Sequence, residues 1–65
     1  MRKAKIYAGE VEVNDRVKRR IDGDFGRVWR IREMSPGRYE FAVAIGGDDE
    51  FFERNDNSFV WIEIP

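Results

Sequence analysis

The segment from Val17 to Ile45 constrains the fold more than any other part of the chain. It contains three short runs rich in β-branched and aromatic residues, and turn-forming residues separate them. Glycine, proline and small carboxylates supply the special backbone angles and local hydrogen bonds of turns. The segment therefore predicts an antiparallel meander, with strands at 17–21, 26–31 and 38–45 and turns at 22–24 and 35–37.

The chain on both sides of this meander also has the alternating pattern of short strands. Gly9 marks a turn or bulge, Gly46-Gly47-Asp48-Asp49 is a hairpin signal, and a polar turn is expected at 55–58. No window holds a helical apolar repeat longer than a turn or two, so the sequence predicts an all-β barrel or sandwich of five or six strands. A further strand is expected at 4–13, in two halves (4–8 and 11–13) on either side of Gly9, and two more are expected at 50–54 and 59–64.

One irregularity is expected within the second strand of the meander. Val28 and Ile31 are three residues apart, a spacing that regular alternation places on opposite faces. A β-bulge near Trp29 and Arg30 would turn both apolar residues toward the core, and small barrels need such bends. Without the bulge, Trp29 and Ile31 would face inward together. We favour the bulge, which leaves Trp29 outside the core.

Length and composition indicate one small domain. A chain of 65 residues and 7.7 kDa has room for a single core, and its net stability should be on the order of a few kcal/mol. No cysteine or histidine is present to supply a disulfide or a soft metal site. Neither a signal-peptide run nor an apolar segment of about 20 residues is found. We expect one soluble, cytoplasmic domain over residues 1–65 that needs no cofactor or metal and contacts no membrane.

The short motifs of the meander carry a family resemblance. Val13–Arg19, Gly26–Ile31 and Gly37–Phe41 match a Gly-Asp-Arg-Val beginning, a Gly-x-Val-x-x-Ile strand and a Gly-x-Tyr-x-Val strand, with Asn14 in place of the usual first glycine. This layout resembles the SH3-like and Tudor-like small barrels of bacteria, over about residues 11–64. The resemblance implies a small five- or six-stranded antiparallel SH3-like barrel. It also implies a binding scaffold, because barrels of this kind dock peptides, polymerases or nucleic acid.

Side chains suited to catalysis are scarce. Histidine and cysteine are absent, and Ser35 and Ser58 fall in predicted turns, where serine commonly bonds to the backbone. The acidic run Asp48-Asp49-Glu50 is expected at a hairpin tip and lacks the spaced ligands of a calcium loop. We therefore expect a protein that is not an enzyme.

Charge is distributed unevenly along the chain, although the formal net charge is −1. Residues 16–32 hold seven basic and two acidic residues, a local charge of +5. Residues 40–56 hold six acidic residues and one basic residue, a local charge of −5. The two stretches form a dipole in space only if the fold keeps them apart.

The basic stretch suggests a nucleic-acid interface, with a base stacked on Trp29 or Phe25. Its cations would be Arg16, Lys18, Arg20, Arg27 and Arg32. A pI of about 5.4 favours the alternative, in which these cations pair across strands with carboxylates. The carboxylates in question are Glu10, Glu12, Glu40 and Glu53.

Several large rings are expected on the surface. If Val60 and Ile62 point inward, Phe59 and Trp61 point outward, and one of the adjacent Phe51 and Phe52 must also face out. Tryptophan and arginine dominate the energetics of protein interfaces. The alternative is that residues 1–13 cover the outer face of the sheet. The expected protein-binding surface consists of Trp29, Arg30, Phe52 and Trp61.

The leading functional hypothesis is a small regulator or inhibitor that docks on a protein partner, or on its own copy, through this aromatic and arginine surface. Nucleic-acid binding through the basic stretch is the second hypothesis. The sequence also leaves open an engineered or idealised domain without a ligand.

Overall fold

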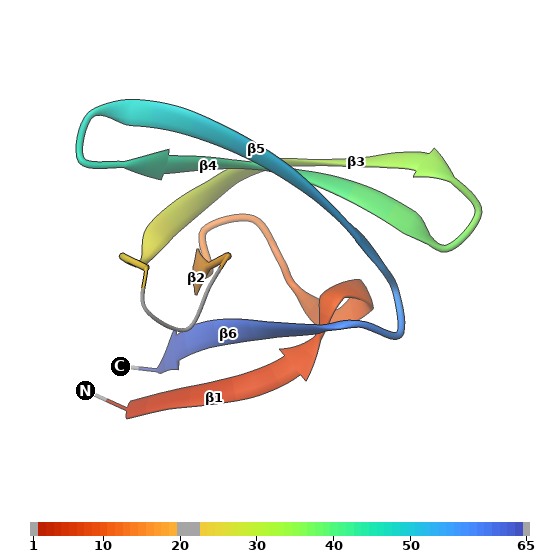
Figure 1. Cartoon of the computed structure of the whole chain (residues 1–65), viewed down its shortest axis with the longest axis horizontal. Helices are drawn as coiled ribbons and strands as arrows, with labels where there is room; N and C mark the ends of the chain where they lie inside the picture. Colours follow the sequence, from red (N-terminus) through yellow and green to blue (C-terminus); the bar gives the residue numbers. More distant parts are fainter. Residues whose placement is uncertain (1, 20–22, 65) are drawn as a thin grey trace.

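A computed structural model describes residues 2–19 and 23–64 and is built almost entirely from antiparallel strands. The strands form one six-stranded sheet in the order β1-β6-β2-β3-β4-β5 (Figure 1). The all-β prediction is confirmed, and β2 to β5 are consecutive neighbours, as expected of a meander. The elements are β1 (Arg2–Tyr7), the 3₁₀ helix η1 (Ala8–Glu10), β2 (Arg16–Lys18), β3 (Gly26–Ser35), β4 (Arg38–Ile45), β5 (Asp48–Asn55) and β6 (Phe59–Ile64). Residues 20–22, which include the end of the strand expected at 17–21, lie outside the described residues.

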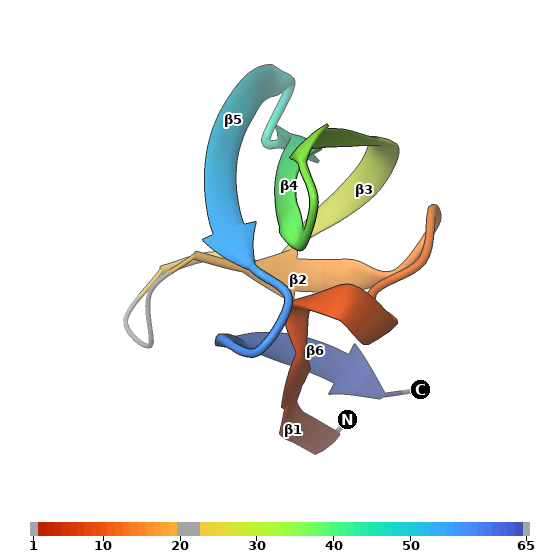
Figure 2. The same cartoon turned by 90° about the vertical axis from the view of Figure 1, so that its right-hand side faces the viewer.

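The sheet is curled but does not close into a barrel. Within the described residues β1 pairs only with β6 and β5 only with β4, so both are edge strands. The curl places β3, β4 and β5 in one half of the molecule and β1 and β6 in the other (Figure 1, Figure 2). Closure is prevented where β1 ends, because the chain turns into η1 there. The backbone N–H groups of Ala8 and Gly9 donate to the carbonyls of Ser58 and Asp56, at 2.7 and 3.3 Å, instead of extending a strand toward β5.

The bulge predicted in the second strand of the meander is confirmed. The β3–β4 register shifts between Val28 and Arg30, so Trp29 is the extra residue. Val28 is completely buried and Ile31 packs against the core, while the Trp29 side chain faces outward with 37 % of the residue exposed. The bulge thus allows two apolar residues three positions apart to reach one core.

The core lies between the two halves of the curled sheet. It consists of a few closely packed apolar residues, and the rings of Phe41 and Phe52 lie 5.3 Å apart within it. Gly26 is buried where β3 begins beside β2 and β4. The buried core residues are Ala8, Val11, Val17, Val28, Phe41, Val43, Phe52 and Val60. In the part of the chain that the structure describes, no helix is long and apolar enough to cross a membrane.

A single arginine connects the edge strand β5 to the chain just after β2. The Arg54 guanidinium donates from Nη1 to the carbonyl oxygen of Glu53 at 2.8 Å and from Nη2 to that of Arg19 at 3.3 Å. It also lies 5.0 Å from the centre of the Phe52 ring. Arg54 therefore joins two segments between which the described residues form no backbone ladder.

Arg54→Met is expected to lower the free energy of unfolding by about 1 kcal/mol, because methionine covers Phe52 but donates no hydrogen bond to either carbonyl. Urea unfolding followed by tryptophan fluorescence measures the change. Arg19→Ala is the matched control, since it also removes an arginine side chain but keeps the accepting carbonyl. Equal losses in the two variants would contradict the assigned role of Arg54.

Candidate functional site

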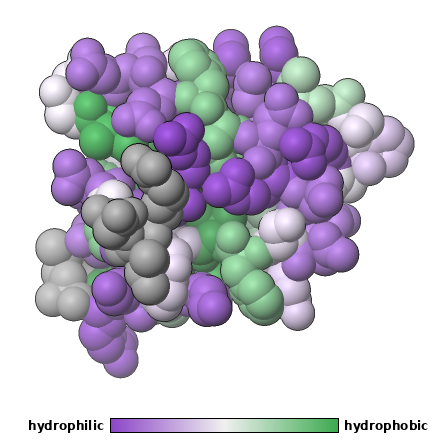
Figure 3. Space-filling view, viewed as in Figure 1, coloured by the Kyte–Doolittle hydropathy of each residue, from purple (hydrophilic) through white to green (hydrophobic). Residues whose placement is uncertain are grey.

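The four residues expected to form the protein-binding surface do not lie together. Trp29 and Arg30 are exposed on the outer face of β3, Phe52 is in the core, and Trp61 is half-buried on β6. The rings divide between the two halves of the sheet. Figure 3 shows one face of the molecule, which is mainly hydrophilic with hydrophobic side chains at a few separate places. Two aromatic surfaces therefore have to be considered separately.

The first surface, which we call the Trp29 patch, consists of Trp29, Arg30, Ala42 and Phe51. The rings of Trp29 and Phe51 meet edge to face, with centroids 6.3 Å apart and an interplanar angle of 75°. The Arg30 guanidinium lies 5.3 Å from the centre of the Trp29 ring. Ala42 pairs with Arg30 on one side and Phe51 on the other. Although Ala42 points away from the core, it is fully buried, so the larger side chains around it exclude water.

Ion pairs border the Trp29 patch on one side. Arg30 and Arg32 each approach Glu40 Oε1 at 3.6 Å, and Arg38 Nε lies 3.0 Å from Glu53 Oε1. These contacts follow from the antiparallel pairing of basic β3 with β4 and of β4 with β5. The charge separation seen along the sequence is therefore partly cancelled in space, and exposed pairs of this kind contribute little stability.

The prediction that Phe52 belongs to the exposed surface is wrong. Phe52 is 8 % exposed, whereas Phe51 is 49 % exposed. The cause is the β4–β5 register, which places Phe52 opposite the buried Phe41 and Phe51 opposite the outward-facing Ala42. A signal for this register was present, because a two-residue turn at Gly46-Gly47 fixes it. Both glycines have positive φ, +58° and +91°, as a type I′ hairpin turn requires.

The second surface, which we call the Phe59 face, lies on β1 and β6. It contains Trp61 together with Tyr7 and Phe59, which are 47 % and 54 % exposed. Lys3 and Lys5 of β1 lie on the same side, opposite Glu63 and Trp61. Residues 2–7 thus form a strand beside β6. They do not cover the outer face of the sheet, which is what the alternative expected of residues 1–13. Tyr7 was not among the expected surface rings, although its alternation with Ala4, Ile6 and Ala8 in the sequence was a signal for it.

Of the five cations expected to contact nucleic acid, the four that the structure describes each contact another group of the domain. Arg16 is exposed but bonds Glu63 Oε1 from Nε at 2.7 Å, and Lys18 is buried, with its ammonium 4.8 Å from the Phe25 ring centre. Arg27 donates to Asn14 Oδ1 at 3.0 Å. Arg32 approaches Glu40, and Arg20 lies outside the described residues. The described members of this set are engaged within the domain, but only Arg32 pairs with a carboxylate that the charge-pairing alternative named, and Arg16 pairs with Glu63 instead.

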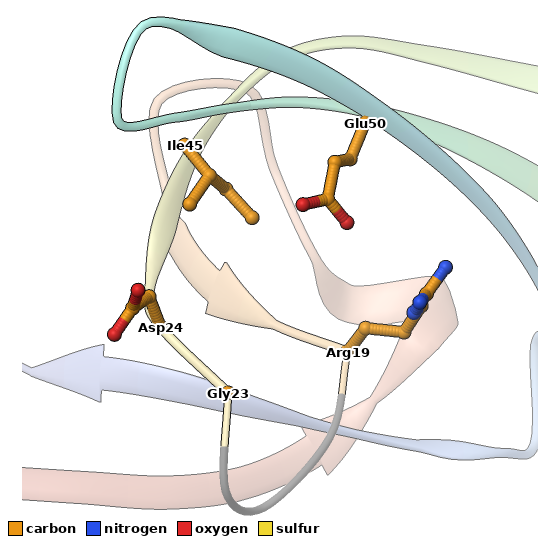
Figure 4. A pocket seen from close by; sticks show the side chains of 5 residues that line it. All are labelled: Arg19, Gly23, Asp24, Ile45 and Glu50. Carbon is orange, nitrogen blue, oxygen red and sulfur yellow. The ribbon is translucent and has the colours of Figure 1, made fainter.

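A small hollow opens beside β5, and none of its lining residues belongs to either aromatic surface. Its volume is about 230 Å³, and Ile45 and Glu50 project toward the chain that carries Arg19 and Asp24 (Figure 4). Ligand sites usually enclose roughly 300–1,000 Å³ and are mostly apolar. Among residues 2–19 and 23–64, no group of three or more acidic side chains lies close enough to hold a metal ion.

Comparison with known proteins adds no relative from which a role could be transferred. No family model matches the chain, and neither the curated proteins nor the solved structures searched contain a match to it. The evidence that the two aromatic surfaces are functional sites therefore comes from the geometry of this chain alone.

Proposed function

We propose that this protein is a non-enzymatic binding module that docks on a protein partner, or on a second copy of itself, through the Trp29 patch. Such a module would act as a small regulator or inhibitor of the protein it binds. The observation that supports this most is the exposed Trp29–Phe51 pair, packed edge to face beside a buried alanine and an arginine. SH3-like kinship is part of the proposal, and the consecutive pairing of β2 to β5 is consistent with it.

The composition of the patch matches the energetics of protein interfaces. Tryptophan and arginine are the residues whose truncation costs most binding energy, and they act best at the centre of a contact from which surrounding groups exclude water. Trp29 and Phe51 are still 37 % and 49 % exposed, so a partner would remove much more of their apolar surface from water. No segment of the described chain lies over them.

The ion pairs at the rim of the Trp29 patch would contribute more to the specificity of binding than to its affinity. The ion pairs of Arg30, Arg32 and Arg38 with Glu40 and Glu53 are exposed, so a partner can reorganise them at low cost. Charges at a rim mainly orient the encounter and exclude wrong partners. The rings would supply most of the affinity.

Site-specific photocrosslinking tests the proposal. A benzophenone-bearing phenylalanine replaces Phe51 in one variant and Val13 in another, in cells that naturally make the protein. Val13 is equally exposed, at 49 %, but lies in the turn before β2, which makes it the matched control. We expect position 51 to give a discrete protein adduct that disappears when Trp29→Ala is added.

Two results would contradict the Trp29 patch as the docking site. One is the absence of any protein adduct from position 51. The other is the same adducts from position 13, or adducts that persist with Trp29→Ala. An adduct of twice the monomer mass identifies the partner as a second copy, which the proposal includes.

A further inference from the structure

The Phe59 face presents alternating residues of two paired strands on one side of the sheet. The register pairs Lys3 with Glu63, Lys5 with Trp61 and Tyr7 with Phe59. Successive residues on one face of a strand are about 7 Å apart. The face therefore offers cations at one end of β1 and rings at the other, with more rings along β6.

Ring faces and ammonium groups are interleaved across this surface. Tyr7 and Phe59 stack with centroids 4.8 Å apart and planes 20° from parallel. The Lys5 ammonium lies 5.4 Å from the Phe59 centroid and 5.6 Å from that of Trp61, and Lys3 lies 5.5 Å from Trp61. Cation–π contacts at exposed sites are weak. The lysine ammonium groups can therefore leave the rings to contact an anion, which attracts them more strongly.

The cations of this face are not neutralised by carboxylates. In the described part of the chain, neither Lys3 nor Lys5 takes part in an ion pair. Glu63, which lies opposite Lys3 in the register, instead accepts from Arg16 at 2.7 Å. This distinguishes the Phe59 face from the Trp29 patch, where Glu40 lies between Arg30 and Arg32.

We propose that the Phe59 face binds single-stranded nucleic acid, as a site separate from the Trp29 patch. Exposed rings that can stack on unpaired bases, beside lysines that can contact phosphates, are the two elements of sequence-tolerant single-strand binding. Paired bases are already stacked and present no free face, so a single strand fits these rings and a duplex does not. The site uses none of the cations of residues 16–32.

Fluorescence anisotropy with a fluorescein-labelled oligothymidylate of 12 nucleotides tests this site over a range of salt concentrations. Each phosphate neutralised on a single strand contributes about 0.7 to the slope of log affinity against log salt. We expect Lys3→Gln with Lys5→Gln to make the slope shallower by about 1.4. Phe59→Ala should weaken binding roughly 5- to 100-fold, because it removes a ring on which a base can stack. It should leave the slope unchanged, because it removes no charge.

The matched control is Arg30→Gln with Arg32→Gln, which removes the same charge from the other half of the molecule and should leave the slope unchanged. Circular dichroism checks that each variant is folded. If Phe59→Ala is not folded, the lysine variant still decides the test, because Lys3 and Lys5 are exposed. The proposal fails if the unaltered protein does not bind at low salt, or if the arginine variant loses as much as the lysine variant. It also fails if polyglutamate displaces the probe as well as unlabelled oligonucleotide does, since the ligand would then be an acidic protein.

Discussion

Gly26→Ala is expected to lower the free energy of unfolding by about 3 kcal/mol and so to unfold much of the protein. A Cβ atom at this position would lie 2.3 Å from Ile45 Cγ1, 2.5 Å from Val43 Cγ1 and 2.6 Å from the carbonyl oxygen of Ala44. The side chains can shift, but the carbonyl belongs to the backbone of β4, which is paired with a strand on both sides. A domain of this size has only a few kcal/mol of net stability to lose.

Circular dichroism and urea unfolding measure the effect of Gly26→Ala. Gly46→Ala is the matched control, because the same methyl group there meets no atom within 4 Å. Its backbone φ of +58° costs an alanine about 1 kcal/mol, which is the loss expected for the control. If both variants lose the same stability, close packing at Gly26 is not what excludes a side chain.

Phe52→Ala is expected to cost about 3 kcal/mol, whereas the neighbouring Phe51→Ala should cost about 1 kcal/mol. Phe52 is 8 % exposed and contacts the Phe41 ring in the core, so its removal leaves a cavity. Phe51 is 49 % exposed and loses mainly its edge-to-face contact with Trp29. The same truncation one residue apart therefore separates a core role from a surface role.

Urea midpoints of the two variants, measured in parallel, decide this comparison. The larger loss in Phe51→Ala would mean that the β4–β5 register is shifted by one residue, which exchanges the two faces of β5. In that case Phe52 would return to the surface, and the Trp29 patch would have to be redefined.

Local patterns in the sequence were sufficient to predict several strands. β4 and β6 begin and end where alternation predicted, at Arg38–Ile45 and Phe59–Ile64. The Val28 and Ile31 spacing predicted the bulge at Trp29, because both residues had to reach one core. These predictions succeeded for the same reason: the alternation of buried and exposed residues can be recognised in the sequence of each strand without knowing its neighbours.

Features that depend on pairing between strands were harder to predict. The sequence of β5 has one phenylalanine on each face, so alternation alone cannot choose between Phe51 and Phe52; only the length of the hairpin turn decides. Barrel closure was expected from the five or six short strands and from the SH3-like resemblance. In the structure η1 bonds to the turn between β5 and β6, and β1 and β5 are edge strands.

The charge pattern shows the same limit. A run of cations from Arg16 to Arg32 is a property of the sequence, but its field depends on the neighbours of each strand. Antiparallel pairing brings Glu40 beside Arg30 and Arg32, and Glu63 beside Arg16. Lys3 and Lys5 of β1 are among the described cations that take part in no ion pair, and the neighbour of this strand could not be assigned from local pattern.

The pairing of β1 with β6 has a consequence for how this protein can be handled. Arg2 lies opposite Ile64 in the register, so the first and last described residues are neighbours (Figure 1). A short flexible linker can therefore join them, and new termini can be opened at the exposed Gly46-Gly47 hairpin. For the same reason the whole unit can be inserted into a surface loop of a carrier protein with little strain on either partner.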